Sequence, residues 1–504
     1  MSDKLTREEL KSFLKEAANL LRGKIDSSDF KHYILGLLFY KRLSDVFDEE
    51  YNKIKTQYGE TLAKNKDLYG EIFYIPEDCS WKDVLKTSKN IGEKINDTFE
   101  KITRENGKRL EGILNRIDFN DKQILPDETV SNLVNHFNQH NLGNENVSGD
   151  LLGDAYEYLI AQFADDAGKK GGEFYTPHKI VELLIKILKP DEGQSVYDPA
   201  CGSGGMLIEA GKYLQDNNKN ALKLFMYGQE NIYNTYVLAR MNMILHGFND
   251  AKIEQGDTFI NPQFFNDDKT LKQFDIVIAN PPWNLKNWMH NVKTINNKQQ
   301  VVDIEDKYNR LTFGRPPASS GDWAWVQHMF ASTTEKGKLG IVLDNGVLFR
   351  GNKEAEARKQ FVENDLIEAV IGLPANLFAN TGSPGCLLII NRDKPQERKN
   401  KIIFIDASKD YLEGKAQNHL REEDVKKTLE TYETYEAIEK YCSVCELSEV
   451  KENDYNLNIS RYVDTTEEEI SVNIPDVLKN LKTLESKRAE INIKLAGFLQ
   501  EVGY

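Results

Sequence analysis

The stretch with the clearest chemical potential is Phe274 to Trp283, which reads FDIVIANPPW. Its first part is short, mostly apolar and rich in β-branched residues, which is typical of a buried strand. Two consecutive prolines cannot continue a central strand, because they donate no backbone hydrogen bond and fix φ. The chain therefore places Asn280, Pro281, Pro282 and Trp283 just beyond the carboxyl end of a strand, where open α/β sheets bind ligands.

These residue types suit a reaction at an amine attached to an aromatic ring. Such a nitrogen is a poor nucleophile, because its lone pair is delocalised into the ring. The side-chain carbonyl of Asn280 and the backbone carbonyl of Pro281 can accept its two hydrogens, which favours a pyramidal nitrogen that attacks an electrophilic methyl group. Trp283 can stack on a flat ring, as aromatic side chains do in base-flipping enzymes. For this motif alone, a β-turn with a core tryptophan remains the alternative.

A second element predicts a ligand pocket that faces this turn. Asp198 to Gly205 reads DPACGSGG, follows an expected strand and opens an expected helix. Glycines let the backbone approach a ligand closely, and a helix N-terminus offers unpaired N–H groups. The glycine spacing differs from the dinucleotide pattern GxGxxG, and the acidic Asp198 suits a cationic ligand better than a polyphosphate.

Two further carboxylates follow the next two expected strands. Glu230 ends one of them, and a carboxylate at this place commonly accepts hydrogen bonds from the two hydroxyls of a ribose. Asp257 lies in the turn after the other, where it can bind the amino group of an adenine. A solvated surface carboxylate would explain either residue alone, but the three successive strand ends together indicate a nucleoside-like ligand.

The elements that must position these residues alternate between strands and helices. A helix is expected at Lys179–Leu188, with Thr176 as N-cap and Pro177 at its first position. The alternation predicts a doubly wound, mostly parallel sheet, with strands at Ser195–Tyr197, Phe225–Gln229, Lys252–Gln255, Phe274–Ala279, Leu339–Leu343, Ala369–Gly372 and Cys386–Asn391. The polar segment 284–321 has little periodicity, so it is either a loop that closes over a substrate or disordered.

The flanking regions are predicted to be helical. Residues 1–145 read as a helical packing or partner domain that opens with the capping box Thr6-x-x-Glu9, and residues 146–410 as the α/β core. A charged extension, 411–470, precedes a tail, 471–504. The tail carries a heptad seam, which favours a helix that pairs with another chain over one packed on its own domain: Val477, Leu481, Leu484, Arg488, Ile491, Leu495, Phe498 and Val502.

Composition limits the function classes. The net charge of −15 over 504 residues argues against a chain that holds nucleic acid alone, although a partner can lend a basic surface. No signal-peptide core and no apolar run of about 18 residues is present, so a cytoplasmic protein without a membrane span is expected. The five cysteines do not form a disulfide framework, and the lone pair Cys442 and Cys445 lacks further ligands, so no metal site is expected.

Taken together, these motifs resemble a known family. The order GEFYTPH at 172–178, DPACGSGG at 198–205, Glu230, Asp257 and NPPW at 280–283 is similar to that of class I S-adenosylmethionine-dependent amino-methyltransferases with a Rossmann-like sheet. The chain more closely resembles the modification (methyltransferase) subunit of type I restriction–modification systems, over nearly its whole length. That family often has phenylalanine where Trp283 stands, and tryptophan preserves the stacking.

The resemblance implies transfer of a methyl group from S-adenosylmethionine to the exocyclic amine of a flipped adenine in duplex DNA. Asn280, Pro281, Pro282 and Trp283 would form the adenine site. The cofactor pocket would consist of Glu173, Phe174, Tyr175, Thr176, Pro177 and His178 on the methionine side, Asp198, Ser203, Gly204 and Gly205 around the Gly-rich loop, Glu230 at the ribose and Asp257 at the adenine.

The resemblance also implies partners. Two such chains would assemble with one DNA-sequence specificity subunit, and restriction would need an ATP-dependent motor subunit. This chain has no GxxxxGK[ST] loop, so it is not expected to hydrolyse ATP. Two alternatives stay open at this point: an amino-methyltransferase that acts on protein glutamine or RNA, and a non-catalytic scaffold that has kept the fold.

Overall fold

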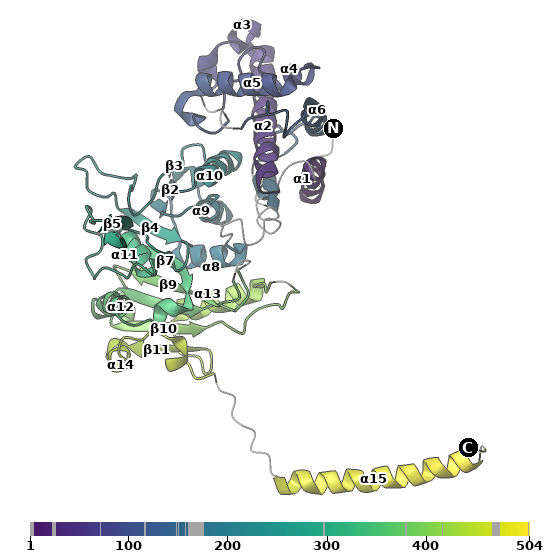
Figure 1. The fold of residues 1–504 in the computed structure, drawn as a ribbon, viewed down its shortest axis with the longest axis vertical. Helices are drawn as coiled ribbons and strands as arrows, with labels where there is room; N and C mark the ends of the chain where they lie inside the picture. Colours follow the sequence, from purple (N-terminus) through teal and green to yellow (C-terminus); the bar gives the residue numbers. More distant parts are fainter. Residues whose placement is uncertain are drawn as a thin grey trace. The chain divides into compact units, whose positions relative to one another are not determined.

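The computed structural model describes most of the chain, namely residues 5–22, 27–70, 72–114, 117–147, 149, 151–156, 158–159, 176–295, 298–378, 381–415, 417–465, 474–501 and 503. The chain divides into two compact units, Met1–Val463 and Asp464–Tyr504. The fold of the first unit is shown as a ribbon in Figure 1. Each unit is described on its own below.

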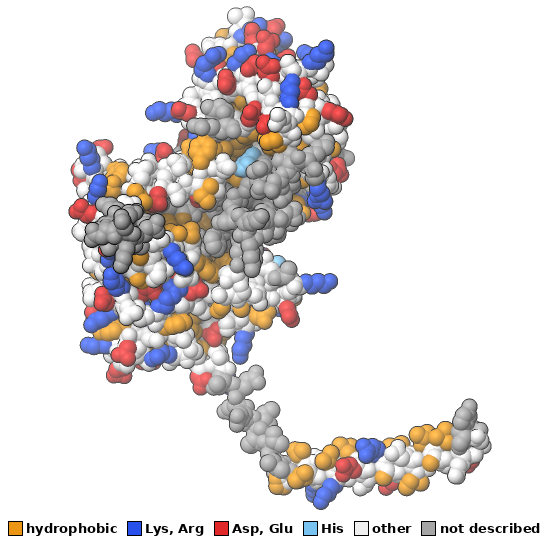
Figure 2. Space-filling model, viewed as in Figure 1, with side chains coloured by type: hydrophobic (Ala, Val, Ile, Leu, Met, Phe, Trp, Pro, Cys, Tyr) orange, Lys and Arg blue, Asp and Glu red, His pale blue; other side chains and the backbone are white. Residues whose placement is uncertain are grey.

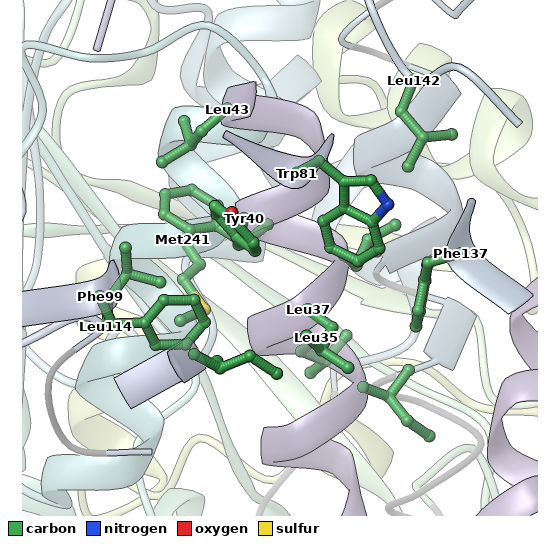
Figure 3. Close-up of a cluster of buried hydrophobic side chains, with 14 of the residues drawn as sticks. Leu35, Leu37, Tyr40, Leu43, Trp81, Phe99, Leu114, Phe137, Leu142 and Met241 are labelled. Carbon is green, nitrogen blue, oxygen red and sulfur yellow. The ribbon is translucent and has the colours of Figure 1, made fainter. Parts of the chain in front are cut away.

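The first part of unit one is helical, as predicted. Its α1 helix opens with the predicted capping box, in which the Glu9 amide donates to Thr6 Oγ1 (3.3 Å) and the Thr6 amide donates to Glu9 Oε2 (2.8 Å). Aromatic side chains pack around the long α2 helix, and Figure 3 shows Tyr40 of α2 among Trp81, Phe99 and Phe137. The helices are α1 (Arg7–Leu21), α2 (Ser27–Tyr58), α3 (Glu60–Ala63), α4 (Trp81–Leu85), α5 (Ile91–Asn106) and α6 (Asp127–Phe137).

The second part of unit one is built on a nine-stranded sheet of described residues, with strand order β11-β10-β8-β9-β7-β4-β1-β2-β3. The strands are β1 (Ser195–Asp198), β2 (Phe225–Glu230), β3 (Lys252–Gln255), β4 (Phe274–Ala279), β7 (Thr333–Asp344), β8 (Ile367–Gly372), β9 (Gly385–Asn391), β10 (Lys401–Asp406) and β11 (Cys442–Glu446). Neighbours are parallel except where β9 pairs with β7 and β8 and where β11 pairs with β10. The predicted doubly wound, mostly parallel sheet is confirmed, and it continues past residue 410 because β11 belongs to it.

Helices cover both faces of the sheet, because successive strand residues point to opposite sides. In β4, Ile276 and Ile278 face a core shared with α8, α9, part of α10 and α13, whereas Val277 and Ala279 face a core shared with α11, α12 and α14. The helices are α8 (His178–Leu188), α9 (Gly205–Asp216), α10 (Tyr233–Leu245), α11 (Asp322–Ala331), α12 (Lys353–Glu363), α13 (Glu422–Thr434) and α14 (Leu447–Glu452).

The α10 helix joins the helical part to the sheet. One of its faces contributes Val237, Leu238 and Met241 to the core of the N-terminal helices, and the opposite face packs Met243 into the core of the sheet. Arg240 on the same helix donates hydrogen bonds of 2.6–2.9 Å to three backbone carbonyls at residues 108, 109 and 111. The two parts of unit one therefore share a helix that begins directly after the predicted ribose carboxylate.

The segment that follows the Asn-Pro-Pro-Trp turn contains regular structure that its sequence does not reveal. Strands β5 (His290–Ile295) and β6 (Lys298–Asp303) pair antiparallel and form a sheet of their own. Behind this hairpin, the buried Arg310 donates to the backbone carbonyls of Thr258 (2.9 Å) and Phe259 (2.6 Å) and to Asp306 (2.8 Å). These bonds tie the segment to the turn that follows β3.

The second unit contains one long helix, α15 (Ile474–Glu501). The apolar seam predicted from the sequence is exposed along it: Val477, Leu481, Leu484, Ile491, Leu495 and Phe498 each keep half or more of their surface, and Figure 2 shows hydrophobic side chains along the whole helix. Val502, the last seam position, lies outside the described residues. Among the helices of the described ranges, none is both long and apolar enough to cross a membrane.

Candidate active site

The predicted site residues come together at one edge of the sheet. Strands β3, β2, β1 and β4 are consecutive neighbours and run parallel, so their carboxyl ends lie side by side. Asp198 and Glu230 are the last residues of β1 and β2, Asp257 lies in the turn after β3, and Asn280 directly follows β4. Residues that are distant in the sequence thereby form one surface.

The Gly-rich loop after β1 depends on two glycines with left-handed backbone. Gly202 has φ +54° and Gly204 has φ +85°, a region that residues with a Cβ atom rarely adopt. A tight turn is closed by the Gly204 amide, which donates to the Cys201 carbonyl (2.8 Å), and α9 begins at the next residue. Asn242 of α10 donates to the Ser203 carbonyl (3.0 Å), so the N-terminal end of α9 is held in place.

Both predicted nucleoside-binding carboxylates are fixed by backbone amides. Glu230 accepts from the amides of Gly202 (3.0 Å) and Ile232 (2.7 Å), which links the end of β2 to the Gly-rich loop. Asp257 accepts from the amides of Phe259 (2.9 Å) and Ile260 (3.0 Å). A carboxylate has about four lone-pair positions, so each can still accept hydrogen bonds from a ligand.

Asp198 is almost fully buried at 2% exposure, and the Ala200 amide donates to its Oδ1 (2.9 Å). Burial raises the pKa of this carboxyl to about 8, and the charge of Glu230 acts in the same direction. Near neutral pH the group is therefore mostly protonated. A cation placed beside it would draw out the carboxylate form.

Asn280 is 9% exposed, and hydrogen bonds hold both ends of its amide. Its Nδ2 donates to Thr176 Oγ1 (2.9 Å), and its Oδ1 accepts from Trp283 Nε1 (3.1 Å). The prediction that Thr176 caps the following helix is wrong, because α8 begins at His178 with Pro177 as its N-cap. The Thr176 hydroxyl contacts the amide of Asn280 instead.

A cavity of about 60 Å³ lies between the turn and the Gly-rich loop. Asn280 and Thr176 line it together with Asp198 and residues of the loop. The complete lining consists of Thr176, Val181, Asp198, Ala200, Cys201, Gly202, Ser203, Gly205, Met206 and Asn280. The amide of Asn280 and the loop therefore face the same space, as a transfer between two bound groups requires.

Other predicted residues either do not line this cavity or lie outside the description. Pro281 is buried and Pro282 is partly buried, whereas His178 Nε2 lies 3.2 Å from Glu209 Oε2 of α9. Gly204 is the N-cap residue of α9, and Gly205, which does line the cavity, is the first residue of that helix. Glu173, Phe174 and Tyr175 lie outside the described residues.

Phe378 is a site residue that the sequence motifs do not reveal. Its ring lies edge-to-face with Trp283, with centroids 4.7 Å apart and an interplanar angle of 70°. Gly385 makes room for this pair, because a Cβ atom there would lie 3.0 Å from atoms of both rings. No local pattern marks Phe378, since it lies in the segment between β8 and β9, far from Trp283 in the sequence.

Two isoleucines beside the carboxylates are also missed by sequence reasoning. Ile232 follows Glu230, Ile260 follows Asp257, and each is 52% exposed. Exposed apolar side chains next to groups that can bind a ribose and an amine suit the two faces of a flat ring. Their positions after the acidic residues could have suggested them, but the sequence does not report their exposure.

A larger cleft, of about 950 Å³, lies among the N-terminal helices. Several of its charged groups already have partners: Lys41 pairs with Asp45, and Lys82 pairs with Asp48 (2.9 Å). It contains none of the predicted site residues. Several of the predicted site residues line the smaller cavity at the sheet edge and not this larger cleft.

A parallel sheet with a glycine-rich pocket, two fixed carboxylates and a facing Asn-Pro-Pro turn defines an α/β methyltransferase. Comparison with known families makes the class specific, because residues 147–470 match the N-6 DNA methylase family and residues 10–137 match the HsdM N-terminal domain. The chain belongs to the N-6 DNA methylase family and, within it, to the methylase subunits of type I restriction enzymes. The resemblance inferred from the motifs is confirmed.

Individual relatives agree over nearly the full length. The chain is 35% identical to the type I restriction enzyme MjaVIII methylase subunit of Methanocaldococcus jannaschii, over 99% of this chain and 86% of the relative. It is 32% identical to the HindI methylase subunit of Haemophilus influenzae, over 82% and 93% of the two chains. The crystal structure of a type I restriction–modification methyltransferase subunit from Streptococcus thermophilus superposes with a TM-score of 0.77 at 32% identity, covering 91% of this chain and 100% of that one.

Proposed function

We propose that this chain methylates the exocyclic amine of an adenine in duplex DNA, as the catalytic subunit of a type I restriction–modification complex. The observation that carries the proposal is the shared cavity, since Asn280 and the Gly-rich loop line the same space. Group transfer needs the reacting atoms within about 3–3.5 Å of each other before reaction. The family match supports DNA as the substrate over protein glutamine or RNA, and an enzyme over a scaffold.

S-adenosylmethionine is the proposed donor, and it supplies an electrophilic methyl group on a sulfonium centre. The residues present fit it: Asp198 offers a buried carboxyl to a cationic group, and the fixed carboxylates of Glu230 and Asp257 keep lone pairs for ribose hydroxyls and an adenine amine. Ile232 and Ile260 offer apolar contact to the ring. Further proposed pocket residues are Glu173, Phe174, Tyr175, Thr176, Pro177, His178, Ser203, Gly204 and Gly205.

At the target end, the proposed role of Asn280 and Pro281 is to accept the two hydrogens of the adenine amine through their carbonyl oxygens. This concentrates the nitrogen lone pair and needs no strong general base. Pro282 stiffens the turn, because its ring restricts φ. Trp283 and Phe378 supply aromatic surface for the flipped base.

We further propose that the chain works with a DNA-sequence specificity subunit, a second copy of itself and, for restriction, an ATP-dependent motor subunit, in the cytoplasm where DNA is accessible. The net charge of −15 supports this division, because phosphate contacts dominate DNA affinity and a partner must supply many of them. The exposed seam of α15 supports a helical partner for the tail 471–504. Residues 1–145 are proposed to serve in helical packing and residues 146–410 in catalysis, and the extension 411–470 is proposed to support the catalytic part, since its β11 completes the sheet.

Labelled methyl donor tests the proposal. The chain is incubated with unmethylated DNA, alone and with its specificity subunit, and label is expected in DNA adenine only when the specificity subunit is present. Label in protein or RNA alone would refute the substrate. Asn280→Ala is expected to abolish methylation and to leave donor affinity unchanged in calorimetry, because its amide lies on the target side of the cavity; unchanged turnover would refute the assigned role of Asn280.

A further inference from the structure

The orientation of the Asn280 amide is decided by its two hydrogen-bond partners. Free asparagine can place its oxygen and nitrogen in either of two positions. The indole N–H of Trp283 is only a donor, so the atom that faces it at 3.1 Å must be the amide oxygen. The amide nitrogen then donates to Thr176 Oγ1 at 2.9 Å, and the hydroxyl accepts.

The indole itself is held firmly. Its N–H also points at the Val342 carbonyl of β7 (3.1 Å), and its far edge fills the space left by Gly385, where a Cβ atom would lie 3.0 Å away. Phe378 packs against it edge-to-face. Because the ring cannot turn without losing these contacts, the direction of its N–H group is fixed by the packing of β7 and β9.

The orientation matters for the proposed reaction. An oxygen that faces the adenine amine accepts one of its hydrogens, whereas an amide nitrogen in that place would present its own hydrogens and repel it. The amide oxygen has two lone pairs, so one can take the indole N–H and the other remains for the amine. Both hydrogen bonds of Asn280 therefore orient the amide that is proposed to contact the target. Asn280 is only 9% exposed, and a buried polar atom without a suitable partner is costly in free energy.

We propose that Thr176 and Trp283 are positioning residues that hold the Asn280 amide with its oxygen available to the target amine. This inference rests on the proposed function. It gives Thr176 a role at the target amine in addition to its place in the proposed donor pocket. It also gives Trp283 a role that a phenylalanine at this position could not fill, because phenylalanine has no N–H group.

The test uses the reconstituted complex with its specificity subunit, target duplex and S-adenosylmethionine. Thr176→Val removes the hydroxyl at nearly constant volume, Thr176→Ser retains it, and Trp283→Phe retains an aromatic ring. Trp81→Phe is the matched control, because the buried indole N–H of Trp81 has no hydrogen-bond partner among the residues that the structure describes. Single-turnover methylation at saturating DNA and donor is measured together with donor affinity and with the fluorescence of 2-aminopurine at the target position.

Thr176→Val is expected to slow single-turnover methylation by about ten-fold, the effect of losing one buried hydrogen bond. Donor affinity is expected to stay within about two-fold, and Thr176→Ser is expected to restore most of the rate. Trp283→Phe is expected to slow methylation by about five-fold while 2-aminopurine fluorescence still reports flipping, and Trp81→Phe is expected to match the unmodified complex.

Rates of Thr176→Val and Trp283→Phe equal to that of the unmodified complex would overturn the inference and leave the proposed function standing. Equal losses in Thr176→Val and Thr176→Ser, or a loss that follows donor affinity, would also overturn it, because the effect would then be structural or lie at the donor. No DNA methylation by the unmodified complex would overturn the proposed function, and this inference with it.

Discussion

Binding of S-adenosylmethionine is expected to release a proton from Asp198, in an amount that follows from the surroundings of this side chain. The carboxyl is 2% exposed, and burial raises its pKa to about 8. At pH 7 about 0.9 of the molecules therefore carry the proton. A bound cation favours the carboxylate, so binding lowers the pKa and releases up to about 0.9 proton per site at pH 7 and up to about 0.1 at pH 9.

Isothermal titration calorimetry in buffers of different ionisation enthalpy measures this release directly. Because the complex holds fewer protons than the free protein, donor affinity is expected to increase with pH up to about 8 and then to level off. Asp198→Asn is the control, since it keeps the shape of the side chain and removes the titrating group. Subtracting its proton count removes any protons that the ligand exchanges itself. A difference near zero between the two proteins at pH 7 would refute the reasoning.

Two more predictions concern the contacts around the site and the tail. Arg310→Ala is expected to lower the free energy of unfolding by about 3 kcal/mol in thermal or chemical unfolding and to weaken donor binding. The reason is that it removes a buried guanidinium that bonds to Asp306 and to the backbone carbonyls after Asp257. An unchanged donor affinity would limit the role of Arg310 to stability. Leu481→Glu on the seam of α15 is expected to weaken assembly with the specificity subunit, whereas Lys482→Glu beside the seam is not. Truncation before Pro475 is expected to act like Leu481→Glu, and an unchanged affinity in sedimentation would count against a partner-binding tail.

Much of the sheet could be predicted because its signals are local. The apolar run before Asn280 and the two prolines after it mark the carboxyl end of β4 without reference to any other segment. The Gly-rich loop marks the end of β1 in the same way, because its left-handed positions require glycine. Since parallel strands place their carboxyl ends along one edge, the convergence of Asp198 and Glu230 followed from strand order alone.

The contacts that complete the site depend on tertiary packing, which no local pattern encodes. The sequence suggests Thr176 as an N-cap because threonine is common at N-cap positions. In the structure its hydroxyl instead accepts a hydrogen bond from the side-chain amide of Asn280, 104 residues away in the sequence. Phe378 lies in the segment between β8 and β9, and only the folded chain brings it beside Trp283. Within the described residues, β5 and β6 pair only with each other. Their sequences are largely polar, so the alternation of apolar and polar residues that reveals a half-buried strand is weak there.

This division between local and tertiary signals indicates where variation in the site is tolerated. The turn needs its amide and its prolines whatever surrounds it, because the chemistry of the acceptor lies there. The contribution of the aromatic residue at position 283 depends on its neighbours. An indole there can donate a hydrogen bond to Asn280 only where a backbone carbonyl such as that of Val342 and a glycine such as Gly385 hold the ring in place. A change from tryptophan to phenylalanine is therefore a change in how the amide is held, although the stacking surface is preserved.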